Sequence, residues 1–365
     1  MGRGLAQKGE ANGAGHTGLW AGHLHRVKGE QLLEQLCVSP SKTHPSIWEK
    51  SHHYLCPLIP FLFPRSASDT PTVLLNTFWS REPGCDSGFG NLLARQLDLR
   101  GLRVLAACLT EKGAEQLRNQ TSDRLQTVIL DVTKTDSVAA ATEWVKERVG
   151  DRGLWGLVNN AGISTPTAPN EWLTKQDFVK ILDVNLLGVI DVTLSVLPLV
   201  RKARGRVVNV SSIMGRVALF GGGYCMSKYG VEAFSDSLRR ELSYFGVKVV
   251  MIEPGYFKTT VTSPKALFQG LQASWNQASP EIKELYGEKF MANLMKSVDL
   301  LLTTCCQDLS LVTNCMEHAL TSCHPRTRYS PGWDAKFIYL PMSYLPSFLV
   351  DLMVYWSNPR PAKAL

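Results

Sequence analysis

The stretch that decides the fold runs from Val207 to Lys228 and reads VVNVSSIMGRVALFGGGYCMSK. It opens with an apolar, β-branched run, Val207 to Val210, which is typical of a parallel strand buried on both faces of a sheet. Ser211 and Ser212 follow directly. This order predicts two hydroxyl groups at the end of a buried strand.

Tyr224 and Lys228 close the same stretch, four residues apart. If a helix begins at Gly223, this spacing puts the phenol and the ammonium group on one face, within reach of each other. A free tyrosine has a pKa of about 10, and a neighbouring cation lowers that pKa toward the range of general acid–base catalysis. We therefore interpret Tyr224 as a proton-exchanging group and Ser212 as the group that holds the substrate oxygen. Taken alone, the Tyr-x-x-x-Lys pattern is more often a solvated helix face.

Other stretches agree with this interpretation in order and spacing: GCDSGFG, LVNNAG, GRVVNVSS, GGYCMSKYGVEAFSD and EPGYF. Through them, the chain from about Gly84 to about Tyr329 resembles the short-chain dehydrogenase/reductase family, whose signature is a serine ahead of Tyr-x-x-x-Lys. The resemblance is closer still to the membrane-associated retinol and hydroxysteroid dehydrogenases of that family. It implies an α/β fold with a doubly wound, mostly parallel Rossmann-type sheet and one nucleotide site at the carboxyl ends of the strands.

A glycine loop opens the predicted helix Asn91 to Leu99. Glycines at such a turn let backbone amides approach a pyrophosphate, and the helix N-terminus adds partial positive charge. A strand-like run, Arg103 to Cys108, follows at the distance expected for a βαβ unit. The resemblance assigns four residues of this loop to cofactor binding: Gly84, Ser87, Gly88 and Gly90.

The choice between NAD and NADP depends on the end of that second strand. Cys108 and Leu109 occupy the place where many NAD enzymes have an acidic residue for the ribose. The extra phosphate of NADP would need a nearby cation, and Lys112 is the only close one, whereas Asp86 lies in the glycine loop. The pattern favours NAD, with NADP as the alternative.

Two further turns match the family. Asp131 follows the predicted strand Thr127 to Leu130, where the resemblance places it at the adenine amino group; an equally good interpretation is a cap for the helix that starts near Thr135. A second predicted strand, Leu154 to Val158, runs into a turn that by resemblance stabilises the sheet and lies along the cofactor. Its assigned residues are Asn159, Ala161 and Gly162.

The remaining site residues also come from the resemblance. Asn185 lies in a long apolar helix, Phe178 to Leu199, where the family uses an asparagine to join a water chain to the active-site lysine. A satisfied core amide is the alternative. After the predicted strand Val247 to Ile252, the resemblance places a Pro-Gly turn beside the nicotinamide and a threonine at its carboxamide or at the diphosphate: Pro254, Gly255 and Thr259.

The chain divides into three parts by pattern. Residues 1–71 show no lasting period, which predicts a poorly ordered extension; residues 72–330 form the predicted catalytic domain, with a substrate lid at about 263–302. Residues 331–365 are an apolar tail in which Ser347 to Trp356 predicts either an interfacial helix or a helix docked on the domain's own surface. Relatives carry a hydrophobic N-terminal anchor that is not recognisable here. Association with the endoplasmic reticulum membrane is therefore expected by resemblance alone.

The residues directly before Gly84 depart from the family. A central strand should be a continuous apolar run, but Arg81, Glu82 and Pro83 stand in that place. The substitute is Thr72 to Trp79, TVLLNTFW, with Ser80 to Pro83 looped out. If this substitute fails, the chain is a catalytically silent dinucleotide-binding module.

The composition of the chain bears on three kinds of partner: nucleic acid, metal ions and a second copy of the chain. The formal charge of +7 is modest and no block of basic residues stands out, so nucleic-acid binding has no support. The nine cysteines lack metal-ligand spacing, which predicts reduced thiols and no metal site. An apolar stripe on the catalytic helix predicts either core packing or, as in related enzymes, a homodimer interface: Val231, Phe234, Leu238 and Leu242.

These observations together predict an NAD-dependent alcohol dehydrogenase acting on a lipophilic alcohol, either retinol or a hydroxysteroid. Tyr224 would remove the hydroxyl proton, and Lys228 would lower the pKa of that tyrosine and hold the ribose. Ser212 would position the substrate oxygen and Asn185 would support the proton path. An NADPH-dependent carbonyl reductase with the same residues working in the opposite direction is the alternative.

Overall fold

The computed structural model describes residues 70–76 and 88–364, which belong to the compact unit Cys56–Leu365. The predictions that concern the N-terminal extension, the insertion at 80–83, Gly84, Asp86 and Ser87 lie outside the described residues.

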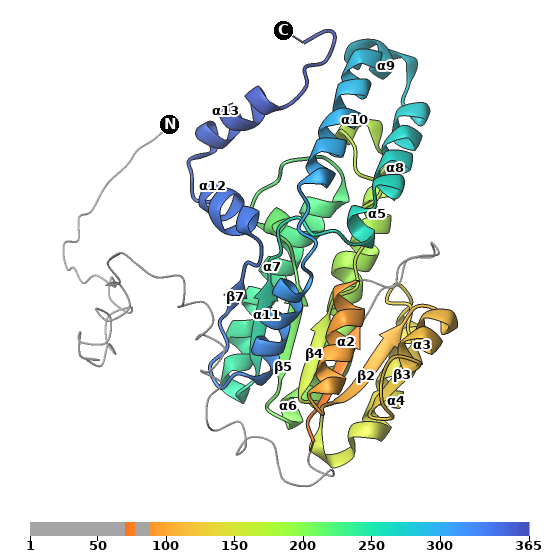
Figure 1. Cartoon of the computed structure of the whole chain (residues 1–365), viewed down its shortest axis with the longest axis vertical. Coiled ribbons are helices and arrows are strands. Elements are labelled where there is room, and N and C mark those ends of the chain that lie inside the picture. Colours follow the sequence, from red (N-terminus) through yellow and green to blue (C-terminus); the bar gives the residue numbers. More distant parts are fainter. Residues whose placement is uncertain (1–69, 77–87, 365) are drawn as a thin grey trace, which may run out of the picture. The chain divides into compact units, whose positions relative to one another are not determined.

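The described residues form one seven-stranded sheet, and each adjacent pair of strands is parallel. The strand order is β3-β2-β1-β4-β5-β6-β7 (Figure 1). The strands are β1 Thr72–Asn76, β2 Arg103–Cys108, β3 Leu125–Ile129, β4 Gly156–Asn159, β5 Arg206–Val210, β6 Lys248–Ile252 and β7 Arg328–Tyr329. The order reverses between β1 and β4, which is the switch point of a doubly wound fold. The predicted fold class is confirmed.

The strand β1 fills the central slot of the sheet. It pairs with β2 on one side and β4 on the other, with Leu74 in register with Leu105 and Leu157. Val73, Leu74 and Leu75 are at most 3% exposed. The prediction that this stretch replaces the missing apolar run is confirmed for residues 72–76, so the sheet of this chain has its central strand.

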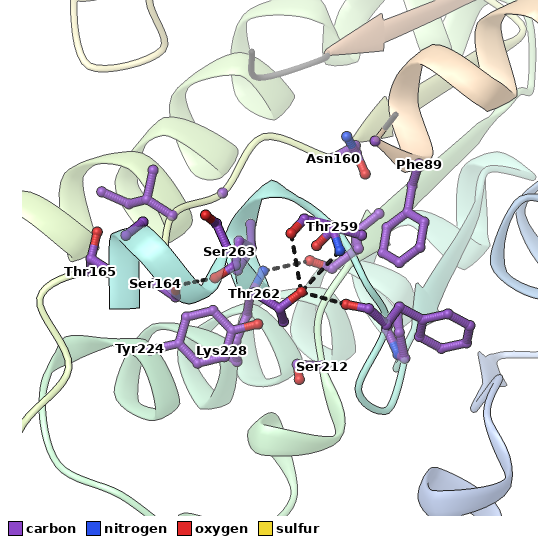
Figure 2. Close-up of a pocket in the computed structure, with 18 of the residues that line it drawn as sticks. Phe89, Asn160, Ser164, Thr165, Ser212, Tyr224, Lys228, Thr259, Thr262 and Ser263 are labelled. Atoms are coloured by element: carbon purple, nitrogen blue, oxygen red, sulfur yellow. Dashed lines mark hydrogen bonds between the residues drawn. The ribbon is translucent and has the colours of Figure 1, made fainter. Parts of the chain in front are cut away.

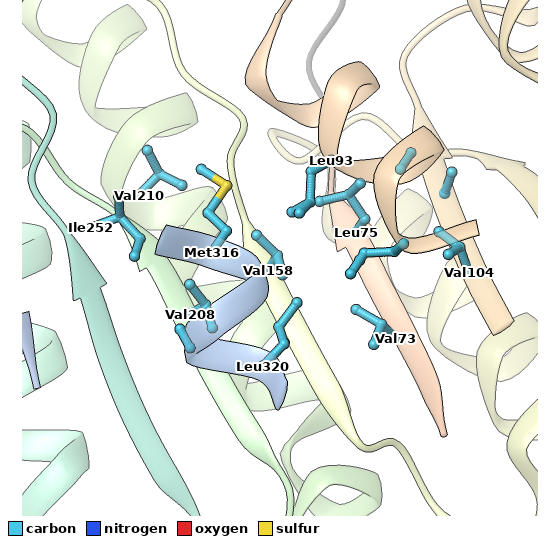
Figure 3. Packing of buried hydrophobic residues seen from close by; sticks show 14 of the residues in the cluster. Val73, Leu75, Leu93, Val104, Val158, Val208, Val210, Ile252, Met316 and Leu320 are labelled. Atoms are coloured by element: carbon cyan, nitrogen blue, oxygen red, sulfur yellow. The ribbon is translucent and has the colours of Figure 1, made fainter. Parts of the chain in front are cut away.

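Helices cover both faces of the sheet, and alternate residues of each strand point into different layers. On one face, α2 (Phe89–Leu99), α3 (Glu111–Arg118) and α11 (Ser310–Thr321) pack against Val73 and Leu75. Figure 3 shows Met316 and Leu320 of α11 lying over Val158 and Val208. On the other face, α4 (Thr135–Val149), α6 (Gly188–Lys202) and α7 (Gly223–Leu242) pack against Leu74.

The long helix predicted from Phe178 to Leu199 is confirmed and is longer than predicted. It consists of α5 (Lys175–Leu182), a π-helical turn η5 (Asp183–Leu187) and α6. Within the described residues, this is the one helix long and apolar enough to cross a membrane. Half of its most apolar part is buried, and α6 packs in the core beneath the sheet, which identifies it as a core helix.

The helix α7 begins at Gly223, as the spacing of Tyr224 and Lys228 requires. The apolar stripe on this helix lies in the core: Val231, Leu238 and Leu242 are buried, and Phe234 packs against the same cluster. Of the two predicted uses of the stripe, core packing is therefore the correct one. A homodimer has no support from these side chains.

Three helices follow β6: α8 (Pro264–Gln277), α9 (Pro280–Tyr286) and α10 (Glu288–Thr303). Their large side chains form a separate apolar cluster with the 3-10 turn η4 (Asn170–Trp172). The Trp172 ring centroid lies 4.8 Å from that of Trp275 and 5.9 Å from that of Phe290. The other short 3-10 turns are Gly150–Arg152, Ile213–Gly215, Ser243–Phe245 and Thr260–Thr262.

The tail after β7 is helical. It contains a π-helical segment η9 (Ala335–Tyr339), α12 (Leu340–Met342) and α13 (Ser347–Ser357), which confirms the helix predicted from Ser347 to Trp356. No residue of α13 is buried. The last residues return to α9, where the backbone amide of Ala362 donates to the carbonyl of Tyr286 over 2.9 Å.

Candidate active site

A cavity of about 430 Å³ opens at the carboxyl ends of β4, β5 and β6 (Figure 2). The start of α2 and the start of α8 complete its wall. The cavity brings together eight of the predicted site residues: Gly88, Gly162, Ser212, Tyr224, Lys228, Pro254, Gly255 and Thr259. In a doubly wound sheet, the carboxyl ends of the strands at the switch point are where ligands bind.

Ser212 comes to the cavity because β5 ends at Val210 and the chain then turns into the 3-10 segment Ile213–Gly215. Its side-chain oxygen caps that segment by accepting from the amide of Met214 over 3.1 Å. The same hydroxyl lies in the cavity wall with the phenol of Tyr224 and lowers the pKa of that phenol. A capped and buried serine holds a fixed rotamer, so its oxygen is a defined anchor beside the tyrosine.

Tyr224 is half-buried, and loss of water around its phenol raises the pKa to about 12, against a smaller lowering by Ser212. The net shift in the protein by itself is therefore upward, and the lowering of this pKa by Lys228 stays a prediction. Loss of hydration for the phenolate outweighs the neighbouring cation, which lies 5.7 Å from the Tyr224 ring centroid. Tyr224 is therefore a neutral phenol at pH 7.

Lys228 lies one helical turn beyond Tyr224, on the same face of α7, as predicted. Its ammonium group donates to the carbonyl oxygen of Val210 over 2.9 Å. Burial lowers the pKa of Lys228 to about 8, against an opposing effect of the Glu232 charge. The pKa of Lys228 therefore lies close to neutral pH, and its nitrogen is hydrogen-bonded to the last residue of β5.

Asn185 is buried in the π-helical turn η5, a type of irregularity that is frequent at functional sites. Its amide accepts from the backbone nitrogen of Ile163 and donates to the carbonyl of the same residue, both over 2.8 Å. It also donates to the hydroxyl of Ser227 over 3.1 Å. Asn185 therefore holds the turn that carries Gly162, and both its own oxygen and the Lys228 nitrogen lie within 4 Å of a Cβ built on that glycine.

Two residues of the Asn159–Gly162 turn lie away from the cavity. Asn159 is buried in β4, where its amide nitrogen donates to Thr193 over 2.9 Å and to Asn209 over 2.8 Å. Ala161 packs in the core below the sheet. Asn160 and Gly162 line the cavity instead. Asn159 therefore has the stabilising role predicted for the turn, whereas Asn160 lines the cavity.

Asp131 and Gly90 also lie outside the cavity lining. The carboxylate of Asp131 accepts from the backbone nitrogen and the hydroxyl of Thr133, over 3.1 and 2.7 Å. The hydrogen bonds with Thr133 and the nearby Lys134 lower the pKa of Asp131 against the effect of burial. The alternative interpretation as a helix cap is wrong, because α4 begins after Lys134 without a side-chain cap.

The start of α2 provides the anion-binding geometry that the glycine pattern predicted. Gly88 is the N-cap, no acidic residue lies in the first turn, and a Cβ on Gly88 would meet no atom within 4 Å. The first amides of the helix have no intrahelical partner. A phosphate group therefore fits at this end of the cavity.

Part of the wall was not predicted. Thr262 orders the turn before α8 by donating to the carbonyl of Phe257 over 2.6 Å and accepting from the amide of Thr259 over 2.9 Å. Ser164 donates to the carbonyl of Val261 over 2.7 Å. The start of α8, which falls within the region predicted as a substrate lid, contributes Ser263, Lys265, Ala266 and Gln269. No local pattern marks these residues, because their place depends on contacts between distant segments.

A second unpredicted group surrounds Tyr224 with apolar side chains. Phe220 stacks on Tyr224, with ring centroids 6.3 Å apart and an interplanar angle of 26°. Tyr256 meets Tyr339 of the tail at 5.8 Å. These residues share a cluster with Leu219 and Leu340. The aromatic residues predicted for the lid do not contribute here, because Trp275, Tyr286 and Phe290 pack with Trp172.

A buried charge network lies beneath the site. Arg328 of β7 donates to Glu253 over 3.0 Å, to Glu232 over 3.0 Å and to Asp236 over 2.9 Å. The carboxylates of Glu253 and Glu232 are 1% and 9% exposed. This network ties β7 to β6 and to the catalytic helix. In the part of the chain that the structure describes, no cluster of side chains is suited to a metal ion.

The fold and the site are those of a nucleotide-binding oxidoreductase, and comparisons with known proteins agree on this class. The sequence profile of the family described as short chain dehydrogenase matches residues 83–269. Human retinol dehydrogenase 16 is 78% identical over 282 residues, which cover 77% of this chain and 89% of the relative. Human 17-beta-hydroxysteroid dehydrogenase type 6 is 66% identical with the same coverage of both chains.

Solved structures show the same fold. A short-chain dehydrogenase from Burkholderia phymatum in complex with NAD has a TM-score of 0.60 at 18% identity, covering 82% of this chain and 99% of the other. One from Streptomyces avermitilis has a TM-score of 0.59 at 24% identity, covering 79% and 96%. The chain belongs to the short-chain dehydrogenase family, which uses NAD or NADP.

Proposed function

We propose that this protein transfers a hydride between a lipophilic alcohol, retinol or a hydroxysteroid, and NAD. The observation that carries the proposal is that Ser212, Tyr224 and Lys228 meet in the lining of one cavity at the switch point. The names of the relatives, retinol dehydrogenase and 17-beta-hydroxysteroid dehydrogenase, support this substrate class.

The chain's own residues hold the dinucleotide as follows. The amides at the start of α2, with Gly88, face the pyrophosphate, and Lys228 holds the ribose next to the nicotinamide. Pro254 and Gly255 border the nicotinamide ring, and Thr259 hydrogen-bonds with it or with the diphosphate. The dinucleotide supplies the hydride acceptor and, in its oxidised form, a positive charge that favours the phenolate of Tyr224.

Tyr224 exchanges the proton of the substrate hydroxyl group. Ser212 binds the alcohol oxygen and fixes its distance from Tyr224, whose phenolate takes the hydroxyl proton. The charged form of Lys228 stabilises that phenolate, and the asparagine in the π-helical turn, Asn185, keeps the neighbouring backbone and the path toward solvent in place. The apolar cluster of Leu219, Phe220, Tyr256 and Tyr339 excludes water from the same face of Tyr224.

We infer that NAD is preferred over NADP. Cys108 ends β2 at the place where many NAD enzymes have their ribose-binding acidic residue, and the exposed Lys112 on α3 is the nearest cation in sequence. Asp131 is the candidate for the adenine amino group, because it follows β3 at the carboxyl edge of the sheet.

One observation favours the opposite direction as a second candidate. A phenol with a pKa of about 12 is protonated at neutral pH, which is the form that a carbonyl reductase needs in order to donate a proton. The same residues would then reduce an aldehyde or ketone with NADPH.

The tail supports association with a membrane surface, as expected for an endoplasmic reticulum protein. Phe348, Tyr355 and Trp356 of α13 are 68%, 55% and 74% exposed, and Arg360 lies 4.9 Å from the Tyr355 ring. Aromatic side chains next to a basic residue suit the headgroup region of a bilayer. We therefore propose that α13 lies in the lipid interface.

A substrate and cofactor panel on the purified full-length chain tests these proposals. Retinol and a hydroxysteroid are incubated with NAD or NADP and followed by the appearance of reduced cofactor; retinal is incubated with NADH or NADPH and followed by its loss. We expect faster turnover with NAD than with NADP. Turnover of retinal with NADPH alone would establish the carbonyl reductase. Absence of turnover with every pair, together with retained NADH binding, would establish a silent binding module.

A further inference from the structure

The tail reaches back over the turn that borders the cavity. Asp334 is 9% exposed, and its carboxylate accepts a hydrogen bond from the backbone amide of Tyr256 over 2.7 Å. The amide of the preceding residue, Gly255, donates to the carbonyl of Pro331 over 3.0 Å. Two successive amides of the turn are therefore held by residues that lie about eighty positions further along the chain.

The fit between the carboxylate and the turn is close. A Cβ built on Gly255 would lie 2.2 to 2.5 Å from the carboxylate atoms of Asp334. A Cβ built on Gly332 would lie 2.5 Å from the same carboxylate, and Gly332 also has a positive φ of 105°. The carboxylate reaches the Tyr256 amide because both neighbouring residues lack a side chain.

The turn held in this way is part of the active-site wall. Pro254, Gly255 and Phe257 line the cavity. The carbonyl of Pro254 accepts from the amide of Ile213 over 3.0 Å, which ties the turn to the residue that follows Ser212. The carbonyl of Tyr256 accepts from the amide of Cys306 over 2.9 Å. A shift of this turn would therefore move the cavity wall and the backbone next to Ser212 together.

We propose that Asp334 is a positioning residue of the active site. It does not line the cavity and acts through the Gly255–Tyr256 backbone, which it holds in the conformation that receives the nicotinamide end of the cofactor. This inference deepens the proposed function and rests on it. It makes the first turn of the tail part of the dinucleotide site.

The test uses Asp334→Ala and Asp334→Asn in the full-length chain, with Asp98→Ala as the matched control. Asp98 is 4% exposed and accepts from the amide of Ser122 over 2.8 Å, at the opposite end of α2 from the cavity. Both alanine variants lose a buried carboxylate that holds a backbone amide. Melting temperature, NADH dissociation constant by fluorescence and kcat for retinol are measured for each.

We expect Asp334→Ala to weaken NADH binding roughly tenfold, as for the loss of one hydrogen bond to a charged acceptor. Asp334→Asn should recover most of the affinity, because an amide oxygen still accepts from Tyr256. Asp98→Ala should lower the melting temperature and leave NADH affinity unchanged. Wild-type NADH affinity in Asp334→Ala, or an equal loss in Asp98→Ala, would overturn the positioning role. If the wild-type chain binds no dinucleotide, the proposed function fails and this inference falls with it.

A double-mutant cycle with Gly255→Ala sharpens the test and covers the case in which Asp334→Ala folds poorly. The added methyl group of Gly255→Ala displaces the carboxylate and should weaken NADH binding by itself. In the Asp334→Ala background the methyl group meets no carboxylate, so the second substitution should cost much less. Strictly additive losses would contradict the proposed contact.

Discussion

The catalytic segment and the C-terminal tail differ in nearly every physical respect. Each residue from Gly205 to Gly215 is buried, and the side chains of Ser212 and Lys228 are held by hydrogen bonds with the backbone. In the tail, by contrast, α13 has no buried residue. The comparison teaches that buried contacts and chemistry extend from the catalytic segment to the first turn of the tail at Asp334, whereas α13 carries neither and is available to contact a membrane surface. Substitutions should therefore separate the two regions cleanly.

The largest expected effect is on the catalytic side. Tyr224→Phe removes the proton-exchanging hydroxyl and should lower kcat by roughly 10²- to 10⁴-fold, while NADH affinity is retained. Steady-state kinetics and fluorescence titration measure the two quantities. Tyr229→Phe is the control, because Tyr229 lies on the same helix, is 44% exposed and does not line the cavity. Wild-type kcat in Tyr224→Phe would remove the basis of the mechanism.

Arg328 lies just before the tail and pairs with carboxylates on α7 and after β6. Of the substitutions considered, replacing Arg328 should lower the free energy of unfolding the most. Arg328→Met removes the cation that pairs with the buried Glu232, while Glu253 keeps its second partner Arg216 at 3.3 Å, and it should lower the free energy of unfolding by about 3 kcal/mol. Arg118→Met breaks an exposed 2.8 Å pair with Glu111 and should cost about 0–1 kcal/mol. Urea unfolding of both variants decides the point. Equal costs would show that the buried network contributes nothing beyond a surface pair.

The pH dependence distinguishes the two reaction directions. With a Tyr224 pKa of about 12, the phenolate fraction grows with pH, so alcohol oxidation should rise from pH 6 to 8. Above pH 8, Lys228 loses its proton and its charge no longer stabilises the phenolate, so the rise should level off. Carbonyl reduction needs the neutral phenol and should stay flat from pH 6 to 8. A flat oxidation profile of kcat/KM over this range would contradict the proton role of Tyr224.

The smallest effect on folding should come from the tail. Phe348→Ser with Trp356→Ser should change the free energy of unfolding by no more than about 0.5 kcal/mol, because both side chains are exposed. The same double variant should bind less to vesicles of phosphatidylcholine and phosphatidylserine in a sedimentation assay. Leu99→Ser with Tyr244→Ser removes apolar side chains that are 85% and 89% exposed elsewhere, and should leave vesicle binding unchanged. Equal vesicle binding by all three proteins would show that α13 is not the membrane contact.

Local patterns predicted the catalytic segment well. The apolar run became β5, the helix begins at Gly223, and Tyr224 and Lys228 share a face of α7, because each of these features depends on residues close in sequence. The central strand was also predicted, from the apolar stretch Thr72 to Trp79, and the structure shows it over Thr72–Asn76 despite the departure from the family before Gly84.

Features that depend on burial or on distant segments were not predicted. The pKa of Tyr224 moves upward because many parts of the chain remove water from the phenol, which the spacing to Lys228 does not reveal. Asp334 and Phe220 reach the site through contacts that no motif records. Asn159 was expected at the cofactor, but the alternation of side chains along β4 turns it into the core and leaves Asn160 at the cavity.

The helices α8 to α10 carry their own small apolar core around Trp172, apart from the two clusters that pack on the sheet. Helices that pack around a separate apolar cluster can unfold locally without exposing the clusters on the sheet. Such local unfolding costs less free energy than global unfolding. We therefore expect amide hydrogen exchange in these helices to report a local opening that costs less free energy than unfolding of the sheet. Because the start of α8 lines the cavity, such an opening would widen the cavity while the sheet stays folded.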